Sequence, residues 1–133
     1  MISNAAYFEW FAKERIDDKS VRITSIIGDV DDHDVIVLDD EIARGTTVVE
    51  LLDKLREHRV RSVRIACTHG LFADGALERI AAAPEVTEIV CTNTVPMPDD
   101  AKTDKLTVLS VAPALAEAIR RIHLGESVSA LFG

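Results

Sequence analysis

The chain alternates between short apolar runs and stretches whose apolar residues recur every three or four positions. Continuous apolar runs predict buried strands, and the recurrence near 3.6 residues predicts amphipathic helices. The predicted strands are residues 21–27, 35–38, 60–67, 86–91 and 106–111. The predicted helices are residues 4–16, a segment with Val48, Leu51, Leu52 and Leu55 on one face, residues 73–81, and residues 113–124 ending at Gly125. The unbroken run at 35–38 is typical of a strand covered on both faces.

This alternation predicts an α/β fold, in which a parallel sheet is flanked by helices. With 133 residues, the chain is long enough for one domain with its own core and short for two. Aromatic residues make up only 5% of the sequence, so the core is expected to consist of Val, Ile, Leu and Ala.

Charge and cysteine content narrow the function classes. The net charge of −8 argues against a general nucleic-acid or membrane-surface binder. Cys67 and Cys91 each lie in an apolar run, which predicts two buried thiols in a reducing cytoplasm. We see no signal peptide and no apolar run near ~18 residues, so a cytosolic protein is expected. Residues 29–34, with four aspartates and one histidine, predict a turn, with a metal-binding loop as the alternative.

The candidate chemistry lies in the stretch VIVLDDEIARGTT, residues 35–47. Asp39 and Asp40 follow a strand at the carboxyl edge of the predicted sheet, where ligands collect. The turn at residues 43–47 leads into a helix, so its N–H groups could hold a phosphate. Two carboxylates beside such a turn suit a sugar diol and Mg²⁺. The structural alternative is that Asp40 begins a turn and that Thr46 or Thr47 caps the helix.

The same stretch resembles the phosphoribosyl-pyrophosphate (PRPP) binding motif of type I phosphoribosyltransferases. Five motifs resemble ribose-phosphate pyrophosphokinases, the PRPP synthetases, in the same order: IIGDV, VIVLDDEIARGTT, CTHGLFADGALERI, TNTVPMP and VLSVAPALAEAIRRIHLGESVSALF. The resemblance covers nearly the whole chain and corresponds to the C-terminal half of that family's two-domain subunit. It implies a three-layer α/β sandwich of the type I phosphoribosyltransferase type that lacks the family's first strands.

The resemblance implies a function in nucleotide biosynthesis. The reaction transfers a pyrophosphoryl group from ATP to the 1-hydroxyl of ribose 5-phosphate, with Mg²⁺, and needs positioning and charge neutralisation more than a protein nucleophile. Asp39 and Asp40 would meet the ribose hydroxyls or the metal. The 5-phosphate would be bound by Ala43, Arg44, Gly45, Thr46 and Thr47.

Three departures from the family pattern bear on activity. The family usually has Thr or Ser in place of Arg44, whose guanidinium could add a phosphate contact or crowd the turn. The resemblance to the family implies that a segment with a strand and a catalytic Lys and Arg is missing, and Lys19 and Arg22 do not map onto that pair. The N-terminal half of the subunit is absent as well, along with the strand that should precede the first helix. The loss of two strands is expected to leave one side of the strand at 35–38 unpaired. We expect another chain, or the relocated first helix, to cover that edge.

Other strand ends carry further candidates for lining the site. Thr68 and His69 follow one strand, and Thr92 and Asn93 follow the next, so all four could lie near the ligand or be ordinary loop residues. Near the C-terminus, Arg120, Arg121 and His123 predict a favourable charge cluster at a helix end.

Two functions are therefore expected. One is a PRPP synthetase that binds ribose 5-phosphate or PRPP, and ATP, and works as a homo-oligomer or as part of a larger protein. The other is a catalytically inactive sugar-phosphate-binding or regulatory subunit that associates with full-length partners. The missing Lys/Arg segment favours the second, and the retained Asp39–Asp40 pair supports the first.

Overall fold

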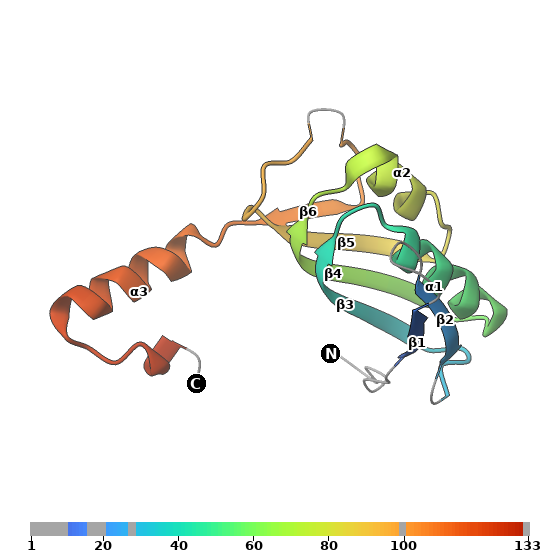
Figure 1. Cartoon of the computed structure of the whole chain (residues 1–133), viewed down its shortest axis with the longest axis horizontal. Helices are drawn as coiled ribbons and strands as arrows, with labels where there is room; N and C mark the ends of the chain where they lie inside the picture. Colours follow the sequence, from blue (N-terminus) through green and yellow to red (C-terminus); the bar gives the residue numbers. More distant parts are fainter. Residues whose placement is uncertain (1–10, 16–20, 27–28, 99–100, 132–133) are drawn as a thin grey trace.

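A parallel four-stranded sheet with two helices on one face forms the centre of the molecule (Figure 1). The computed structural model describes residues 11–15, 21–26, 29–98 and 101–131, and for the first two ranges only the backbone path. The sheet consists of β3 (Asp34–Ile42), β4 (Ser62–Gly70), β5 (Val86–Thr92) and β6 (Leu106–Leu109). The helices are α1 (Thr46–Glu57), α2 (Ala76–Ala81) and α3 (Ala112–Leu124), with short 3₁₀ turns at Ala73–Gly75 and Ser129–Leu131. The predicted α/β class and parallel sheet are confirmed.

The strands lie side by side in chain order, β3-β4-β5-β6. Each neighbouring pair is parallel, and Val37, Ile65 and Ile89 lie in register across the first three strands. Because all four strands run the same way, their carboxyl ends share one edge of the sheet. The predicted strands all appear, although β3 continues four residues beyond Leu38 to Ile42. Asp39 and Asp40 therefore lie within the last part of this strand rather than after it.

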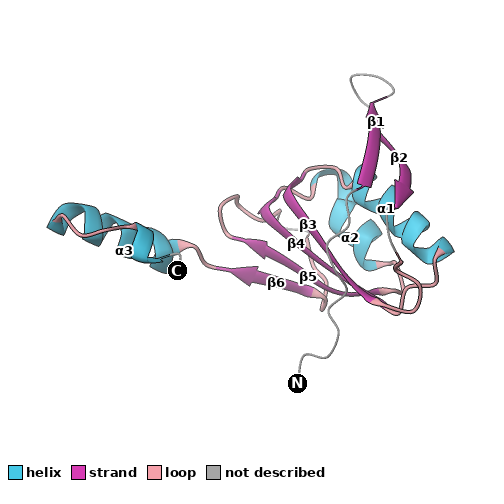
Figure 2. Cartoon of the chain, turned by 90° about the horizontal axis from the view of Figure 1, so that it is seen from below, coloured by secondary structure: helices cyan, strands magenta, loops and turns pink. Residues whose placement is uncertain are grey.

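The core lies between the sheet and helices α1 and α2, which cover the same face in Figure 2. The predicted face of α1 is confirmed, since Val48, Leu51, Leu52 and Leu55 are all buried. Both predicted buried thiols are confirmed too, because Cys67 and Cys91 are free and buried. From α2 and the strands the core receives Ala76, Leu77, Ile80, Val63, Ile65, Val86 and Ile89.

No helix of the described residues packs on the opposite face of the sheet, so the prediction that residues 35–38 are covered on both faces is wrong. Ile36 and Leu38 point to that face and keep 55% and 54% of their surface exposed. The predicted unpaired edge is confirmed, because β3 pairs only with β4 among the described strands. The apolar run at residues 35–38 therefore includes side chains that are exposed on this face.

Helix α3 would be the source of that layer, but it extends away from the sheet (Figures 1 and 2). Only Ser110 and Val111 separate it from β6, and the Asn93 side chain binds both: its Oδ1 accepts from the Val111 N–H at 2.9 Å, and its Nδ2 donates to Ser110 Oγ at 3.4 Å. The predicted apolar face of α3 is therefore exposed, including Leu115, Ile119 and Ile122. The third layer of the expected sandwich is present as a helix but does not rest on the sheet.

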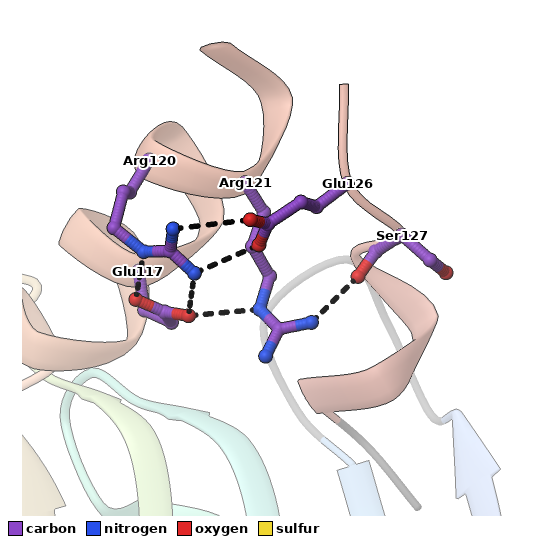
Figure 3. Close-up of polar contacts among 5 residues, drawn as sticks. All are labelled: Glu117, Arg120, Arg121, Glu126 and Ser127. Atoms are coloured by element: carbon purple, nitrogen blue, oxygen red, sulfur yellow. Dashed lines mark hydrogen bonds and ion pairs between the residues drawn. The ribbon is translucent and has the colours of Figure 1, made fainter. Parts of the chain in front are cut away.

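The predicted charge cluster on α3 is confirmed for its two arginines (Figure 3). Glu117 accepts from Arg120 and Arg121, and Arg120 also donates to Glu126 at 2.8 Å. These contacts lower the pKa of Glu117 to about 2, chiefly through the Arg120 and Arg121 hydrogen bonds. The cluster joins the last turns of α3 to the segment that follows Gly125.

The prediction of a helix over residues 4–16 is wrong where the structure describes it. Residues Phe11–Arg15 form strand β1, which pairs antiparallel with β2 (Val21–Ile26) and has an irregularity between Ala12 and Lys13. Residues 1–10 and 16 lie outside the described part. Pairing with β2 supplies backbone hydrogen bonds that override the helical spacing of a short apolar pattern. The expected relocated helix over the β3 edge is thus absent from residues 11–15.

Two further predictions concern loops and membranes. Residues 29–33 form the predicted turn, and no group of three or more His, Cys, Asp or Glu side chains in the described parts could hold a metal, so the metal-loop alternative is not supported. In those parts of the chain, none of the helices has the length and hydrophobicity needed to cross a bilayer.

Candidate functional site

A hollow of about 290 Å³ lies where β3 ends and α1 begins. Because the loop between them is only three residues long, the last strand residues and the first helical turn face the same space. The hollow is lined by Asp39, Glu41, Ile42, Ala43, Arg44, Gly45, Thr46, Thr47 and Val48. Six of the seven residues that the sequence predicted for the main site are among them, and Asp40 is the exception.

Gly45 sets the shape of the turn. Its φ of 67° lies in the left-handed region, which favours glycine. A Cβ at this position would come within 3.0 Å of Ile80 Cδ1 and 3.2 Å of the Ala76 Cβ. The turn can therefore pack closely on α2 only because residue 45 has no side chain.

The N-terminus of α1 opens into the hollow. Gly45 is the N-cap, and its carbonyl accepts the first helical bond from Val49 N–H at 2.9 Å. The N–H groups of Thr46, Thr47 and Val48 precede that bond and have no acceptor within the helix. The positive end of the helix dipole adds to these donors, so the hollow suits an anion. The structural alternative, in which Asp40 begins a turn and a threonine caps the helix, is wrong: Asp40 lies inside β3 and Gly45 is the cap.

The two aspartates lie at the other side of the turn, with their carboxyl groups close together. The Asp40 N–H donates to Asp39 Oδ1 at 2.9 Å. The pKa of the Asp40 carboxyl is lowered, first by a hydrogen bond with the Asp39 side chain and then by the backbone N–H groups of Asp40 and Glu41. Asp39 lines the hollow and is partly buried, whereas Asp40 is exposed beside it. The pair thus offers one carboxylate inside the hollow and one at its rim.

These two carboxylates could hold Mg²⁺ only if the ligand and water supply the rest of its coordination. Mg²⁺ is usually held by one or two carboxylates together with water and substrate phosphates. Asp39 and Asp40 can supply two carboxylates from adjacent residues, and the described residues contain no cluster of three or more ligands that would form a closed protein site. The ligand would have to complete the coordination.

Arg44, the residue that departs from the family pattern, neither crowds the turn nor points freely into the hollow. Its Nε forms an ion pair with Asp74 Oδ2 at 3.1 Å, and both side chains are largely exposed. Asp74 has a φ of 56° and lies in the 3₁₀ turn before α2, where the predicted helix at 73–81 is interrupted. This partner could not be predicted from the sequence, because the two residues come from different loops.

The secondary candidates form a network at the neighbouring strand ends, outside the hollow. Thr92 Oγ1 donates to the Thr68 carbonyl at 2.7 Å, and His69 Nδ1 lies 2.8 Å from Thr94 Oγ1. Asn93 fixes the start of α3, as described above. In the β3–β4 register His69 pairs with Glu41 and Cys67 pairs with Asp39, so Thr68 and His69 lie on the strand next to the aspartates. Thr92 and Asn93 instead hold strand ends together.

The remaining candidates are not placed at the hollow. Lys19 lies outside the described residues, and Arg22 belongs to β2, of which only the backbone path is described. Sequence reasoning missed Glu41, which lines the hollow two residues after Asp39, and Arg79, which donates to the Arg44 carbonyl at 2.7 Å. Strand alternation places Glu41 and Asp39 on the same face and could have found the first; the second depends on tertiary contact.

Comparison with known proteins relates this arrangement to one family. Residues 12–133 match the phosphoribosyl synthetase-associated domain. A Streptomyces coelicolor protein, provisionally named a ribose-phosphate pyrophosphokinase, is 69% identical over 121 residues, which are 91% of this chain and 38% of that protein. The ribose-phosphate pyrophosphokinase of Deinococcus radiodurans is 46% identical over 124 residues, which are 90% of this chain and 38% of that protein.

A solved structure agrees with these matches. The phosphoribosylpyrophosphate synthetase from Mycobacterium smegmatis superposes with a TM-score of 0.71 at 38% identity, covering 82% of this chain and 35% of that one. The chain therefore spans little more than a third of the length of these relatives. That it corresponds to their C-terminal half stays a prediction from the motifs. On the extent of the domain match and the identity to these relatives, the chain belongs to the ribose-phosphate pyrophosphokinase (PRPP synthetase) family.

Proposed function

We propose that this chain supplies the ribose 5-phosphate or PRPP site of a ribose-phosphate pyrophosphokinase. The observation that carries the proposal is the hollow at residues 39–48, where a carboxylate and a helix N-terminus face each other across one short turn. A phosphorylated sugar has the same two features, a dianionic group and a diol. The sizes are compatible too, since about 290 Å³ is near the lower end of small-molecule pockets.

The chain's own residues would bind and orient the sugar phosphate. The N–H groups of Thr46, Thr47 and Val48 would donate to the 5-phosphate, and the two threonine hydroxyls could add further donors. Asp39 and Asp40 would accept from the ribose hydroxyls. Mg²⁺ bound at these carboxylates would neutralise charge on the phosphates of the substrates. Together these contacts hold the sugar while its 1-hydroxyl meets ATP.

Calorimetric titration with ribose 5-phosphate and Mg²⁺ tests the site. We expect binding by the unaltered chain and a tenfold or greater loss for ribose without its phosphate, because charge-assisted hydrogen bonds contribute about 1.5–3 kcal/mol. Asp39→Asn should weaken binding, and Asp104→Asn, at an exposed position in the turn before β6, should not. No binding of ribose 5-phosphate or PRPP, even by Arg44→Thr, would refute the sugar-phosphate site.

A second candidate function is a non-catalytic sugar-phosphate-binding or regulatory subunit. Arg44 is the one cation among the described residues that line the hollow, and Asp74 already pairs with it. Transfer of a pyrophosphoryl group requires more positive charge than this around the phosphates. AMP formation from ATP and ribose 5-phosphate distinguishes the two functions: turnover by the chain alone would exclude the second, and binding without turnover would support it.

The same proposal includes a cellular compartment and an association with other chains. An enzyme or subunit that uses ATP and ribose 5-phosphate would work in the cytoplasm, which agrees with two free thiols. Association with a second copy or with a full-length relative would cover the open edge at β3 and the open face of the sheet.

A further inference from the structure

Four successive carbonyl groups of the turn beside the hollow all accept hydrogen bonds, the first three from residues 71–79 and the fourth from α1. The Ile42 carbonyl accepts from Leu71 N–H at 3.0 Å and Phe72 N–H at 3.1 Å, and the Ala43 carbonyl accepts from Ala73 N–H at 2.9 Å. The Gly45 carbonyl accepts the first helical bond of α1. Only the carbonyl between them, that of Arg44, is held by a side chain, through Arg79 Nη2 at 2.7 Å.

The direction of a carbonyl fixes the direction of the next N–H group. Within one planar trans peptide, the C=O and the following N–H point to opposite sides. Holding the Arg44 carbonyl toward Arg79 therefore turns the Gly45 N–H away from α2, toward the side on which the hollow lies. The N–H groups of Ala43 and Arg44 are fixed in the same way by the main-chain bonds to Ile42 and Ala43.

Arg79 also ties this turn to the loop that carries Asp74. Its Nη1 donates to the Asp74 carbonyl, while the Asp74 carboxylate pairs with Arg44 Nε at 3.1 Å. Arg44, Asp74 and Arg79 thus form a closed ring of contacts between two loops that are 30 residues apart in the chain. A planar guanidinium suits this task, because its fixed fork of donors can serve two carbonyls at once.

We propose that Arg79 is a positioning residue of the phosphate site: it does not touch the ligand but orients the N–H groups of the turn toward it. This inference rests on the proposed function for its ligand, and on the main-chain contacts for its geometry. Because Arg79 is an exposed residue of α2, its replacement should leave the core intact.

Arg79→Met and Arg56→Met form a matched pair for the test. Arg56 is likewise an exposed helical arginine with two polar contacts, to Asp53 and Glu85, but it contacts neither loop of the ring. In Arg79→Met, amide hydrogen exchange at Ala73 and Val49, which donate to the turn carbonyls, should become about tenfold faster, and inorganic phosphate and ribose 5-phosphate should bind about tenfold more weakly. Arg79→Lys should recover part of both effects, and Arg56→Met should show neither.

Two results would overturn the inference: no change in exchange or phosphate affinity in Arg79→Met, or equal changes in Arg56→Met. Failure of the unaltered chain to bind phosphate or ribose 5-phosphate would instead refute the proposed function. The exchange rates alone would then decide whether Arg79 holds the turn.

Discussion

Replacing Gly45 by alanine should destabilise the protein through two separable effects. A φ of 67° costs a non-glycine residue about 1–2 kcal/mol. The new Cβ would also lie 3.0 Å from Ile80 Cδ1 and 3.2 Å from the Ala76 Cβ, both in the buried core. Inserting one methyl group into a packed site costs about 1–3 kcal/mol. Restriction of the unfolded chain returns about 0.5–1 kcal/mol, so a net loss of about 1–4.5 kcal/mol is expected.

Gly75→Ala isolates the backbone effect, because Gly75 has a nearly identical φ of 70° but its nearest atoms, in Glu78 and Arg79, would be 3.6 and 3.7 Å from a Cβ. Urea denaturation of both variants measures the difference, which should be about 1–3 kcal/mol, or a midpoint lower by roughly 0.5–1.5 M for Gly45→Ala at a slope near 2 kcal/mol/M. Equal losses in the two variants would show that the turn does not pack on α2 as described.

Three other changes test the core, the charge cluster on α3 and the buried thiols. Leu55→Ala should lower the free energy of unfolding, measured by urea denaturation, by about 2–5 kcal/mol, since Leu55 is fully buried. Leu109→Ala, at a position that is 53% exposed, should lower it by less than about 1 kcal/mol. Similar losses in the two variants would contradict the assigned core. The pKa of Glu117 is lowered to about 2 from 4.5, so the stabilisation of α3 by its ion pairs should be complete above pH 4.5 and lost as the pH falls toward 2. The helical circular dichroism signal at 222 nm should therefore decline over that pH window. A decline of the same size in Glu117→Gln would refute this origin. Burial raises the pKa of the Cys67 thiol to about 11. At pH 8 a thiol reagent should therefore label Cys67 in the native protein on the order of a hundredfold more slowly than in the urea-unfolded chain. Comparable labelling rates would exclude a buried, protonated thiol.

The spacing of apolar residues predicted most of the fold, because most helices and strands bury the residues that their own spacing places on one face. The four strands and the buried face of α1 follow from apolar spacing that any compact arrangement must bury. The pattern failed at residues 11–15, where pairing with β2 overrides helical spacing, and at 35–38, where the apolar run indicates a covering layer that is not on the sheet. Sequence spacing cannot reveal whether a second layer is in place.

The site shows the same division between local and tertiary information. The turn at 43–47 and Asp39 could be predicted because strand, turn and helix are contiguous, so their order fixes their geometry. The partners of Arg44 could not, because Asp74 and Arg79 reach it only through the packing of the next loop and α2 against the turn. The effect of an unusual residue in a motif thus depends on a segment outside that motif.

The isolation of α3 has a consequence for how the chain melts. The helix has 13 residues, about the length at which an isolated helix is only marginally stable in water. It shares no extensive contact with the sheet, so its unfolding does not disturb the core formed by α1, α2 and the strands. Heating should therefore give a gradual loss of helical signal before one sharp transition, with a calorimetric enthalpy that two-state analysis does not reproduce. In this chain a single melting temperature describes the core and leaves the last helix out.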